Sequence, residues 1–226
     1  MRTLLLLALL APLPALAGPW PRARGEAFVF AGHVTGADGW TGLYAEYGLP
    51  RDLTLGVVAG GRPTNGTRAG EARARVFLRV PVLTGEAKPA WLAPWRFALE
   101  ASLGRDHDAD GGTTRYGLGA TVGRGFQSRF GDGWTTLDLR ADHAPDAPLR
   151  IELQTVLGLK PHPRWTVELG LFATQEIDLT LPARPDLELT VAPTVQYSLG
   201  KWGDARLGLS LGDGRTGVTL GWARSF

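Results

Sequence analysis

From Glu26 to the C-terminus, apolar residues alternate with small or polar ones, and this period of two constrains the fold more than any other feature. The segment 204–212 is the cleanest example. One face carries Ala205, Leu207, Leu209 and Leu211, and the other carries Arg206, Gly208 and Ser210. Successive side chains of a strand point to opposite faces, whereas a helix repeats every 3.6 residues. The alternation therefore predicts strands with one apolar face and one small or polar face.

The same alternation recurs along the chain and predicts about twelve strands, an even number that places both termini of a bacterial barrel on one side. The expected strands are 26–34, 41–49, 53–61, 72–83, 95–104, 114–123, 135–142, 149–159, 165–174, 187–199, 204–212 and 217–226. The predicted fold class is all-β: a transmembrane antiparallel up-and-down β-barrel.

The connections between these strands alternate between two sides of the predicted barrel. On the side of the N-terminus they are 50–51, 84–94, 124–133, 160–164 and 200–203. On the other side they are 35–39, 62–70, 105–112, 143–148, 175–185 and 213–215. Outer-membrane barrels combine short periplasmic turns with longer outer loops. Two of the periplasmic connections are as long as the outer ones, so the assignment of the sides stays open.

The aromatic residues separate a membrane barrel from a secreted β-sandwich, which also alternates but buries its apolar faces. Membrane barrels carry aromatic girdles near the ends of their strands. Eight aromatic residues lie near predicted strand ends: Trp40, Trp95, Tyr116, Trp165, Tyr197, Trp202, Trp222 and Phe226. This placement favours the membrane barrel, with the soluble sandwich as the alternative.

The N-terminus has the three parts of a secretory signal peptide. Arg2 provides the positive start, Leu4–Leu10 the apolar core, and Ala15–Ala17 a cleavage site of small residues. No later run of ~18 apolar residues could form a transmembrane helix. We therefore expect a signal peptide over 1–17, one barrel domain over 18–226, and a location in the bacterial outer membrane, with membrane lipid as a partner.

Composition excludes several other classes of protein. The chain has no cysteine, so no disulfide supports the fold. It has 24 basic and 22 acidic residues, and loss of Arg2 with the signal leaves 23 against 22. This balance predicts no nucleic-acid partner. Glycine makes up 31 of 226 residues, roughly twice its average share, which fits tight turns and crowded strand interiors.

The last ten residues, GVTLGWARSF, resemble the C-terminal assembly signal of outer-membrane barrels. That signal ends in Phe and has apolar residues at alternate positions before it. Val218, Leu220, Trp222 and Phe226 match the pattern, whereas Arg224 stands where an aromatic or apolar residue is usual. The resemblance implies that the barrel assembly machinery is a partner.

A second resemblance lies in the segment Tyr44–Gly56, YAEYGLPRDLTLG. It is similar to the EYGLT-x-x-L-x-LG hairpin of small proteobacterial outer-membrane barrels. One such family is associated with phenol degradation by the meta pathway and with proposed uptake. The match covers about a dozen residues, and it indicates the compartment rather than a substrate.

Charged residues on the small or polar faces would line the lumen if the apolar faces meet lipid. Arginines gather on two neighbouring strands: Arg73, Arg75, Arg79 and Arg96. Acidic residues spread over later strands: Glu100, Asp138, Glu152, Glu168 and Glu188. Opposed charges of this kind create the transverse field of a porin constriction. We expect passive, porin-like passage of small solutes. The alternative is a structural barrel whose side chains pair and plug the lumen.

Two further chemistries have weaker support. Asp106, Asp108 and Asp110 begin like a calcium loop, but the position of the bidentate Glu is Gly117, so we expect no metal and no cofactor. A lipid-modifying enzyme would need a serine beside a histidine on the outer surface. The strand serines fall on lumen faces, and His33 has no serine partner in the pattern, so we expect no catalytic residues and no enzyme.

Overall fold

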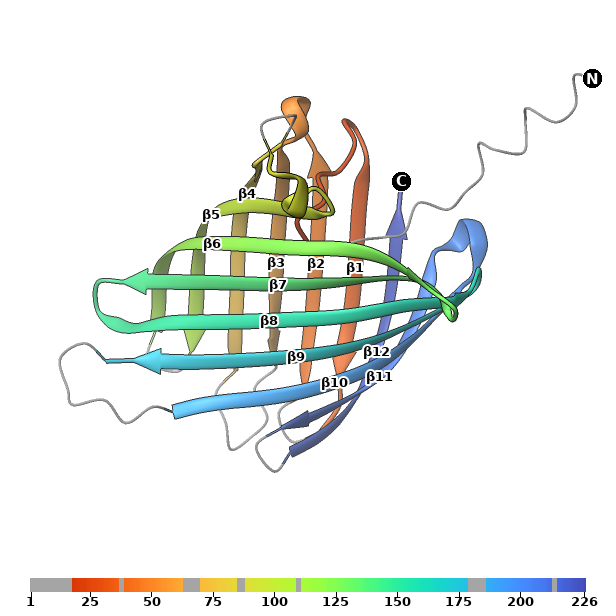
Figure 1. Cartoon of the computed structure of the whole chain (residues 1–226). Coiled ribbons are helices and arrows are strands. Elements are labelled where there is room, and N and C mark those ends of the chain that lie inside the picture. The colour runs from red at the N-terminus through yellow and green to blue at the C-terminus, as the bar shows by residue number, and fades with distance from the viewer. Residues whose placement is uncertain are drawn as a thin grey trace, which may run out of the picture.

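The computed structural model describes residues 18–36, 39–62, 70–84, 88–108, 111–178, 186–212 and 215–226. The described residues form twelve strands in one closed antiparallel barrel, in which each strand pairs with its neighbours in sequence and β1 pairs with β12 (Figure 1). The predicted fold class is confirmed, and the soluble sandwich is excluded. The predicted signal peptide, 1–17, lies outside the described residues.

The strands have the following bounds: β1 Ala27–Val34, β2 Trp40–Gly48, β3 Thr54–Arg62, β4 Glu71–Val82, β5 Trp95–Asp108, β6 Gly111–Ser128, β7 Gly131–Ala144, β8 Ala147–His162, β9 Trp165–Ile177, β10 Asp186–Ser198, β11 Asp204–Gly212 and β12 Arg215–Ser225. Three short 3-10 helices connect strands: η1 Pro50–Asp52, η2 Ala90–Leu92 and η3 Gly200–Trp202. Among the described residues, no helix is long and apolar enough to cross a bilayer.

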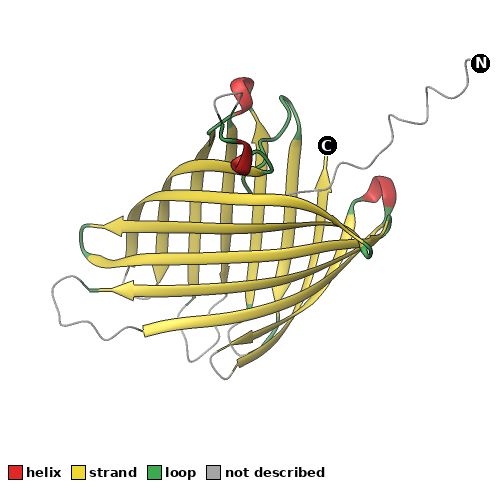
Figure 2. Ribbon diagram, viewed as in Figure 1, coloured by secondary structure: helices red, strands yellow, loops and turns green. Residues whose placement is uncertain are grey.

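The C-terminus and five connections lie at one end of the barrel, which we call the inner end (Figures 1 and 2). Three of these connections contain the 3-10 helices, and the other two are tight turns. The opposite end is the outer end. The predicted inner connection 124–133 is wrong, because β6 and β7 stay paired down to Ser128 and Gly131. The predicted outer loop 105–112 is also wrong, because β5 continues to Asp108 and β6 begins at Gly111. Hydrogen bonds between backbones extend these strands beyond the end of the apolar alternation.

The outward face of the barrel is apolar. Strands β2 to β12 all expose large apolar side chains there, including Leu118, which is 72% exposed, and Leu207, which is 56% exposed. The inward positions of the same strands hold charged residues, threonines, glycines and a few aromatic rings. A soluble β protein has the reverse arrangement, with its apolar face buried.

Many inward aromatic rings lie on a glycine of the same or a neighbouring strand. The ring of Phe77 covers Gly56, and a side chain at Gly56 would collide with it. Phe30 lies in the same way against Gly32 and Gly221. This packing accounts for part of the glycine excess, because a ring can lie flat on the wall only where the wall has no side chain.

Most of the predicted girdle residues lie at the inner end. Trp165 begins β9 and packs on Tyr197 with ring centroids 4.7 Å apart, and the indole of Trp222 donates a hydrogen bond to the carbonyl oxygen of Trp202 (2.8 Å). Phe226 ends the chain and is 60% exposed. The prediction that Trp40 belongs to a girdle is wrong. Trp40 begins β2 but faces the lumen, where its indole lies against Gly60.

Candidate functional site

The inner half of the lumen holds the N-terminal segment, residues 18–24, which lies across it before β1 begins. A side chain at Gly123 on β6 would collide with Pro19 and Trp20, so the segment starts against that wall. It ends against β2, where a side chain at Gly48 would meet the carbonyl oxygen of Ala23. The segment therefore spans the lumen from β6 to β2 and fills part of its inner half.

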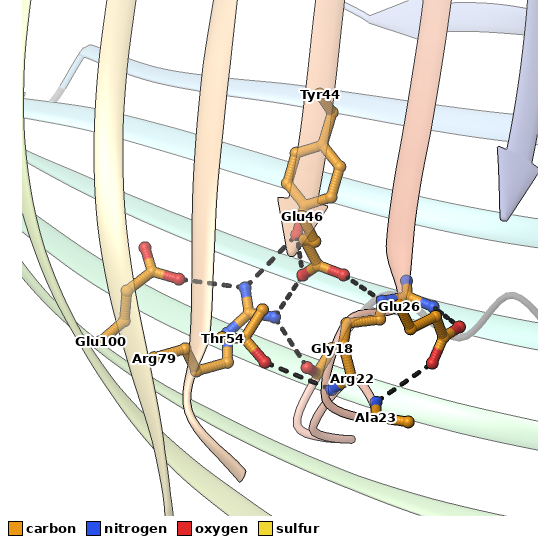
Figure 3. Close-up of polar contacts among 9 residues, drawn as sticks. All are labelled: Gly18, Arg22, Ala23, Glu26, Tyr44, Glu46, Thr54, Arg79 and Glu100. Atoms are coloured by element: carbon orange, nitrogen blue, oxygen red, sulfur yellow. Dashed lines mark hydrogen bonds and ion pairs between the residues drawn. The ribbon is translucent and has the colours of Figure 1, made fainter. Parts of the chain in front are cut away.

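Buried ion pairs tie this segment to the wall, and we call the group Arg22, Tyr44, Glu46, Arg79 and Glu100 the inner cluster (Figure 3). The Glu46 side chain is fully buried, and its two oxygens accept from Arg22 Nε and Arg79 Nη1, each at 2.7 Å. Arg79 Nη2 donates to Glu100 at 3.0 Å. Arg79 Nη1 also donates to the carbonyl oxygen of Gly18 at 2.9 Å. The cluster thus anchors the N-terminal segment inside the barrel.

The hydroxyl of Tyr44 completes the inner cluster by donating a hydrogen bond to Glu46. The Tyr44 ring packs on Phe28 and Phe77, with centroids 6.2 and 5.9 Å away. The Phe77 ring in turn lies under the guanidinium of Arg79 at 4.9 Å. Aromatic rings therefore cover the buried charges and separate them from the space further out.

Beside the N-terminal segment, the inner half of the lumen keeps a cavity of about 500 Å³, the inner cavity. Its wall comes from β7 to β12 and the inner turns. Polar and charged residues from these elements dominate it: Lys160, Arg164, Thr166, Glu168, Gln196, Lys201, Asp204 and Arg224. The inner end is thus only partly filled.

The outer half of the lumen holds a second cavity of about 420 Å³, the outer cavity. Five arginines and three acidic residues line it: Arg73, Arg75, Arg115, Arg140, Arg150, Asp106, Asp142 and Glu152. Aromatic side chains complete the wall: Phe30, Trp40 and Tyr44. The lining therefore carries more positive than negative charge.

Three of the five arginines are neutralised by carboxylates. Asp106 accepts from both Arg115 and Arg150, at 2.9 and 2.8 Å. Arg150 also pairs with Glu176 at 2.9 Å. Arg140 pairs with Asp142 at 3.0 Å and with Glu152. Every acidic residue of the cavity is therefore already engaged.

The remaining two arginines, Arg73 and Arg75, form no ion pair with any described residue. Their guanidinium groups lie over aromatic rings, Arg73 over Trp40 and Arg75 over Phe77, each at 5.8 Å. In Arg75, Nε and Nη1 are buried and have no hydrogen-bond partner among the described residues. The strand register explains this, because the residues opposite Arg75 are Val58 on β3 and Gly104 on β5.

Three side chains in contact link the linings of the two cavities. Glu168, which lines the inner cavity, pairs with Arg206 on β11. The Arg206 guanidinium lies 5.1 Å from the ring centre of Phe30, which lines the outer cavity. A solute passing from one cavity to the other would move beside these three side chains.

The structure distributes the predicted lumen residues over several places. Arg79 and Glu100 meet in the inner cluster, and Arg73, Arg75 and Glu152 meet in the outer cavity. The others lie apart from these groups. Glu168 lines the inner cavity, Asp138 accepts a hydrogen bond from Thr121, Arg96 donates to turn carbonyls at the inner rim, and Glu188 is exposed near the outer end of β10.

Arg22 and Glu46 hold the inner cluster together and are not among the lumen residues predicted from sequence. Glu46 is the one charged residue on β2, and Arg22 lies in GPWPR, a segment with two prolines and no alternation. A lone carboxylate on a lumen face needs a cation nearby, and this signal was available. The N-terminal segment supplies this cation, and that could not be predicted because it depends on how the chain enters the barrel.

The prediction that Asp106 and Asp108 lie in a loop is wrong. Asp106 and Asp108 belong to β5, and the Asp106 carboxylate is taken up by two arginines. Asp110 lies outside the described residues. Within the described part of the chain, no group of three acidic, histidine or cysteine residues is arranged to hold a metal ion.

The outer surface carries one pair that resembles part of a hydrolase site. His33 Nδ1 lies 2.9 Å from Thr41 Oγ1 near the outer end of β1 and β2. Among the described residues, no carboxylate contacts His33. A catalytic triad needs a third group that orients the histidine, so this pair gives little support to hydrolysis.

No family model and no curated protein sequence matches this chain. Among solved structures it is similar to the KdgM porin, with a TM-score of 0.60 and 10% identity, over 88% of this chain and 99% of that chain. The same values hold for the KdgM porin in complex with disordered oligogalacturonate. A structure from a study of in-meso crystallization of membrane proteins has a TM-score of 0.50 and 12% identity, over 89% of this chain and 84% of that chain. At such low identity the likeness concerns the fold, and the chain has the fold of an outer-membrane β-barrel porin.

Proposed function

We propose that this protein is an outer-membrane barrel that passes small solutes passively between its outer and inner ends. The exposed apolar face suits the hydrocarbon of a bilayer, and the polar lumen suits water. The aromatic residues at the inner end suit the membrane interface. The predicted signal peptide is in keeping with export to that compartment.

The observation that carries the proposal is the succession of two cavities along the lumen, about 500 and 420 Å³ in volume. The contacts of Arg206 with Phe30 and with Glu168 link the lining of one cavity to that of the other. Charged side chains line both cavities, which favours hydrated solutes over lipid. The KdgM porin has a complex with oligogalacturonate, and the hairpin 44–56 resembles a family with proposed uptake; both are in keeping with passage.

A second candidate function is a structural barrel that does not conduct. The N-terminal segment and the inner cluster favour it, because they fill the lumen between β2 and β6 with side chains that are ion-paired. Barrels of this size lie between those that are filled by side chains and those that hold a channel. The two functions differ in whether the inner cavity continues into the outer one.

The experiment that separates them is a liposome-swelling assay with the purified mature chain. We expect sugars and amino acids of low mass to enter proteoliposomes faster than protein-free liposomes, with a cut-off in solute size. The barrel that is boiled and left unfolded is the control. Swelling at the rate of protein-free liposomes, from protein that migrates as a folded barrel, would favour the structural alternative.

Assembly by the barrel machinery is a further part of the proposal. Val218 and Leu220 are exposed on the outward face of β12, where Trp222 also lies. Phe226 follows β12, is exposed, and pairs with Ala27 of β1 at the closing seam. Deletion of Phe226 should lower the amount of heat-modifiable barrel in the outer-membrane fraction. Deletion of Ser225 and Phe226 together should lower it at least as far. Unchanged levels after the single deletion would argue against an assembly signal.

A further inference from the structure

We propose that the outer cavity binds a small organic anion, a carboxylate with an apolar body, and that Arg73 and Arg75 hold its carboxylate. This inference rests on the proposed function only in that the anion would be a solute on its way through the lumen. The site is defined by the two arginines and by the aromatic wall next to them, Phe30, Trp40 and Tyr44.

The charge of the cavity favours an additional anion. Its three acidic residues are engaged by Arg115, Arg140 and Arg150, and Asp106 serves two of these at once. Arg73 and Arg75 form no ion pair among the described residues, although Asp106 lies opposite Arg73 on β5. Both project from the same face of β4, two residues apart, so their side chains start roughly 7 Å from each other.

The state of Arg75 points in the same direction. Its Nε and Nη1 are removed from solvent yet donate to no described group. A guanidinium nitrogen that is buried without an acceptor costs free energy, and a carboxylate is the acceptor whose geometry matches its fork. The other arginines with an orphan nitrogen in the inner half, Arg22 and Arg79, differ because each already holds a carboxylate.

The walls of the cavity favour an organic over an inorganic anion. Trp40 and Phe30 face the space beside the two arginines, and Arg73 already lies over the Trp40 ring. A volume of about 420 Å³ accommodates an apolar body as well as the charged group. An anion with no apolar part would leave this wall in water and would gain only the charge.

Calorimetric titration of the detergent-folded barrel tests the site whether or not the barrel conducts. The probes are hexanoate, its neutral counterpart hexanamide, and inorganic phosphate. We expect saturable binding of hexanoate, and weaker binding of the other two by about tenfold or more, because each lacks either the charge or the apolar body.

The variants are Arg75→Gln and the double change Arg73→Gln with Arg75→Gln, compared with Arg96→Gln at the inner rim. We expect Arg75→Gln to weaken hexanoate by about tenfold and the double change to abolish saturation, while Arg96→Gln has no effect. Arg75→Lys keeps the charge but loses the fork, and it should retain part of the affinity. Heat-modifiable migration establishes that each variant is folded.

Three results would overturn the proposal. They are equal binding of hexanoate and hexanamide, phosphate binding as tight as that of hexanoate, and affinity unchanged by the double substitution. Saturable binding that depends on Arg75 in a barrel without solute flux would leave the binding site standing and end the proposed passage. Flux without any hexanoate binding would leave the proposed passage standing and end the proposed binding site.

Discussion

Two arginines on one face of β4, Arg79 and Arg75, show how the inner and outer halves of the lumen differ. Arg79 lies opposite Glu100 on β5 and reaches Glu46 on β2, so its charge is compensated inside the wall. Arg75 lies four residues further out on β4, opposite Gly104. Its guanidinium forms no ion pair with a carboxylate among the described residues. The same residue type is structural in one place and available to a solute in the other.

The difference follows from register, because the residues directly across a strand pair determine which charges can meet. In the inner half, Glu100 lies directly opposite Arg79, and the Glu46 carboxylate on β2 is also within reach. In the outer half, valine and glycine lie opposite Arg75, and the carboxylate opposite Arg73, that of Asp106, pairs with Arg115 and Arg150 instead. Charge on a lumen wall therefore indicates a solute path only where its cross-strand neighbours do not neutralise it.

The largest expected effect comes from Glu46→Ala in the inner cluster. The change leaves Arg22 and Arg79 buried without a shared carboxylate, and it should destabilise the barrel by about 3 to 5 kcal/mol. Urea unfolding in lipid vesicles, followed by tryptophan fluorescence, measures it. The matched control is Glu152→Ala in the outer cavity, which leaves Arg140 paired with Asp142 and should cost less than about 1 kcal/mol. Equal losses would remove the distinction between the two halves.

The next effect tests the outward and inward faces that both halves share. Leu153→Arg on β8 would place a charge against the bilayer and should cost about 2 to 4 kcal/mol. The adjacent Gln154→Arg faces the lumen, where it lies opposite Asp138 on β7, and it should be nearly neutral. The same unfolding assay compares the two. If Gln154→Arg is the more damaging change, the apolar face does not meet lipid.

The strand positions could be predicted from sequence because burial in a bilayer imposes a period of two on every strand. β11 has the predicted bounds, and the bounds of β1 to β4 differ from the predicted ones by at most one residue at either end. The prediction failed for β5 to β7, whose ends lie beyond the apolar alternation and are held by backbone pairing alone. The prediction for Trp40 failed because an aromatic residue at a strand end can face either the lipid or the lumen.

The lumen face of the charged residues named from sequence was also predictable, but their partners were not. Arg79 with Glu100 was inferable in principle from two adjacent strands, since it needs only their register. The contact between Arg22 and Glu46 depends on an N-terminal segment that enters the barrel, and the sharing of Asp106 by Arg115 and Arg150 depends on the curvature of the wall. These are tertiary properties, and alternation along the chain carries no information about them.

A smaller effect is expected on conductance, because the N-terminal segment obstructs the inner half of the lumen. Deleting residues 19–21 removes the part of the N-terminal segment that packs against Gly123, and it should raise the single-channel conductance about twofold or more by widening the inner half. Planar-bilayer recording measures it, with the exposed change Pro21→Ala as the control. A conductance that is unchanged by the deletion would mean that solutes pass only on the side of the inner cavity.

The reversal potential of the purified barrel in a KCl gradient tests the central claim most directly, because it reports both an open lumen and the charge of its outer half. We predict a measurable conductance that prefers chloride, and a preference that falls or reverses when Arg73 and Arg75 are both changed to Glu. Absence of conductance in the folded parent, or a preference for potassium, would contradict the account.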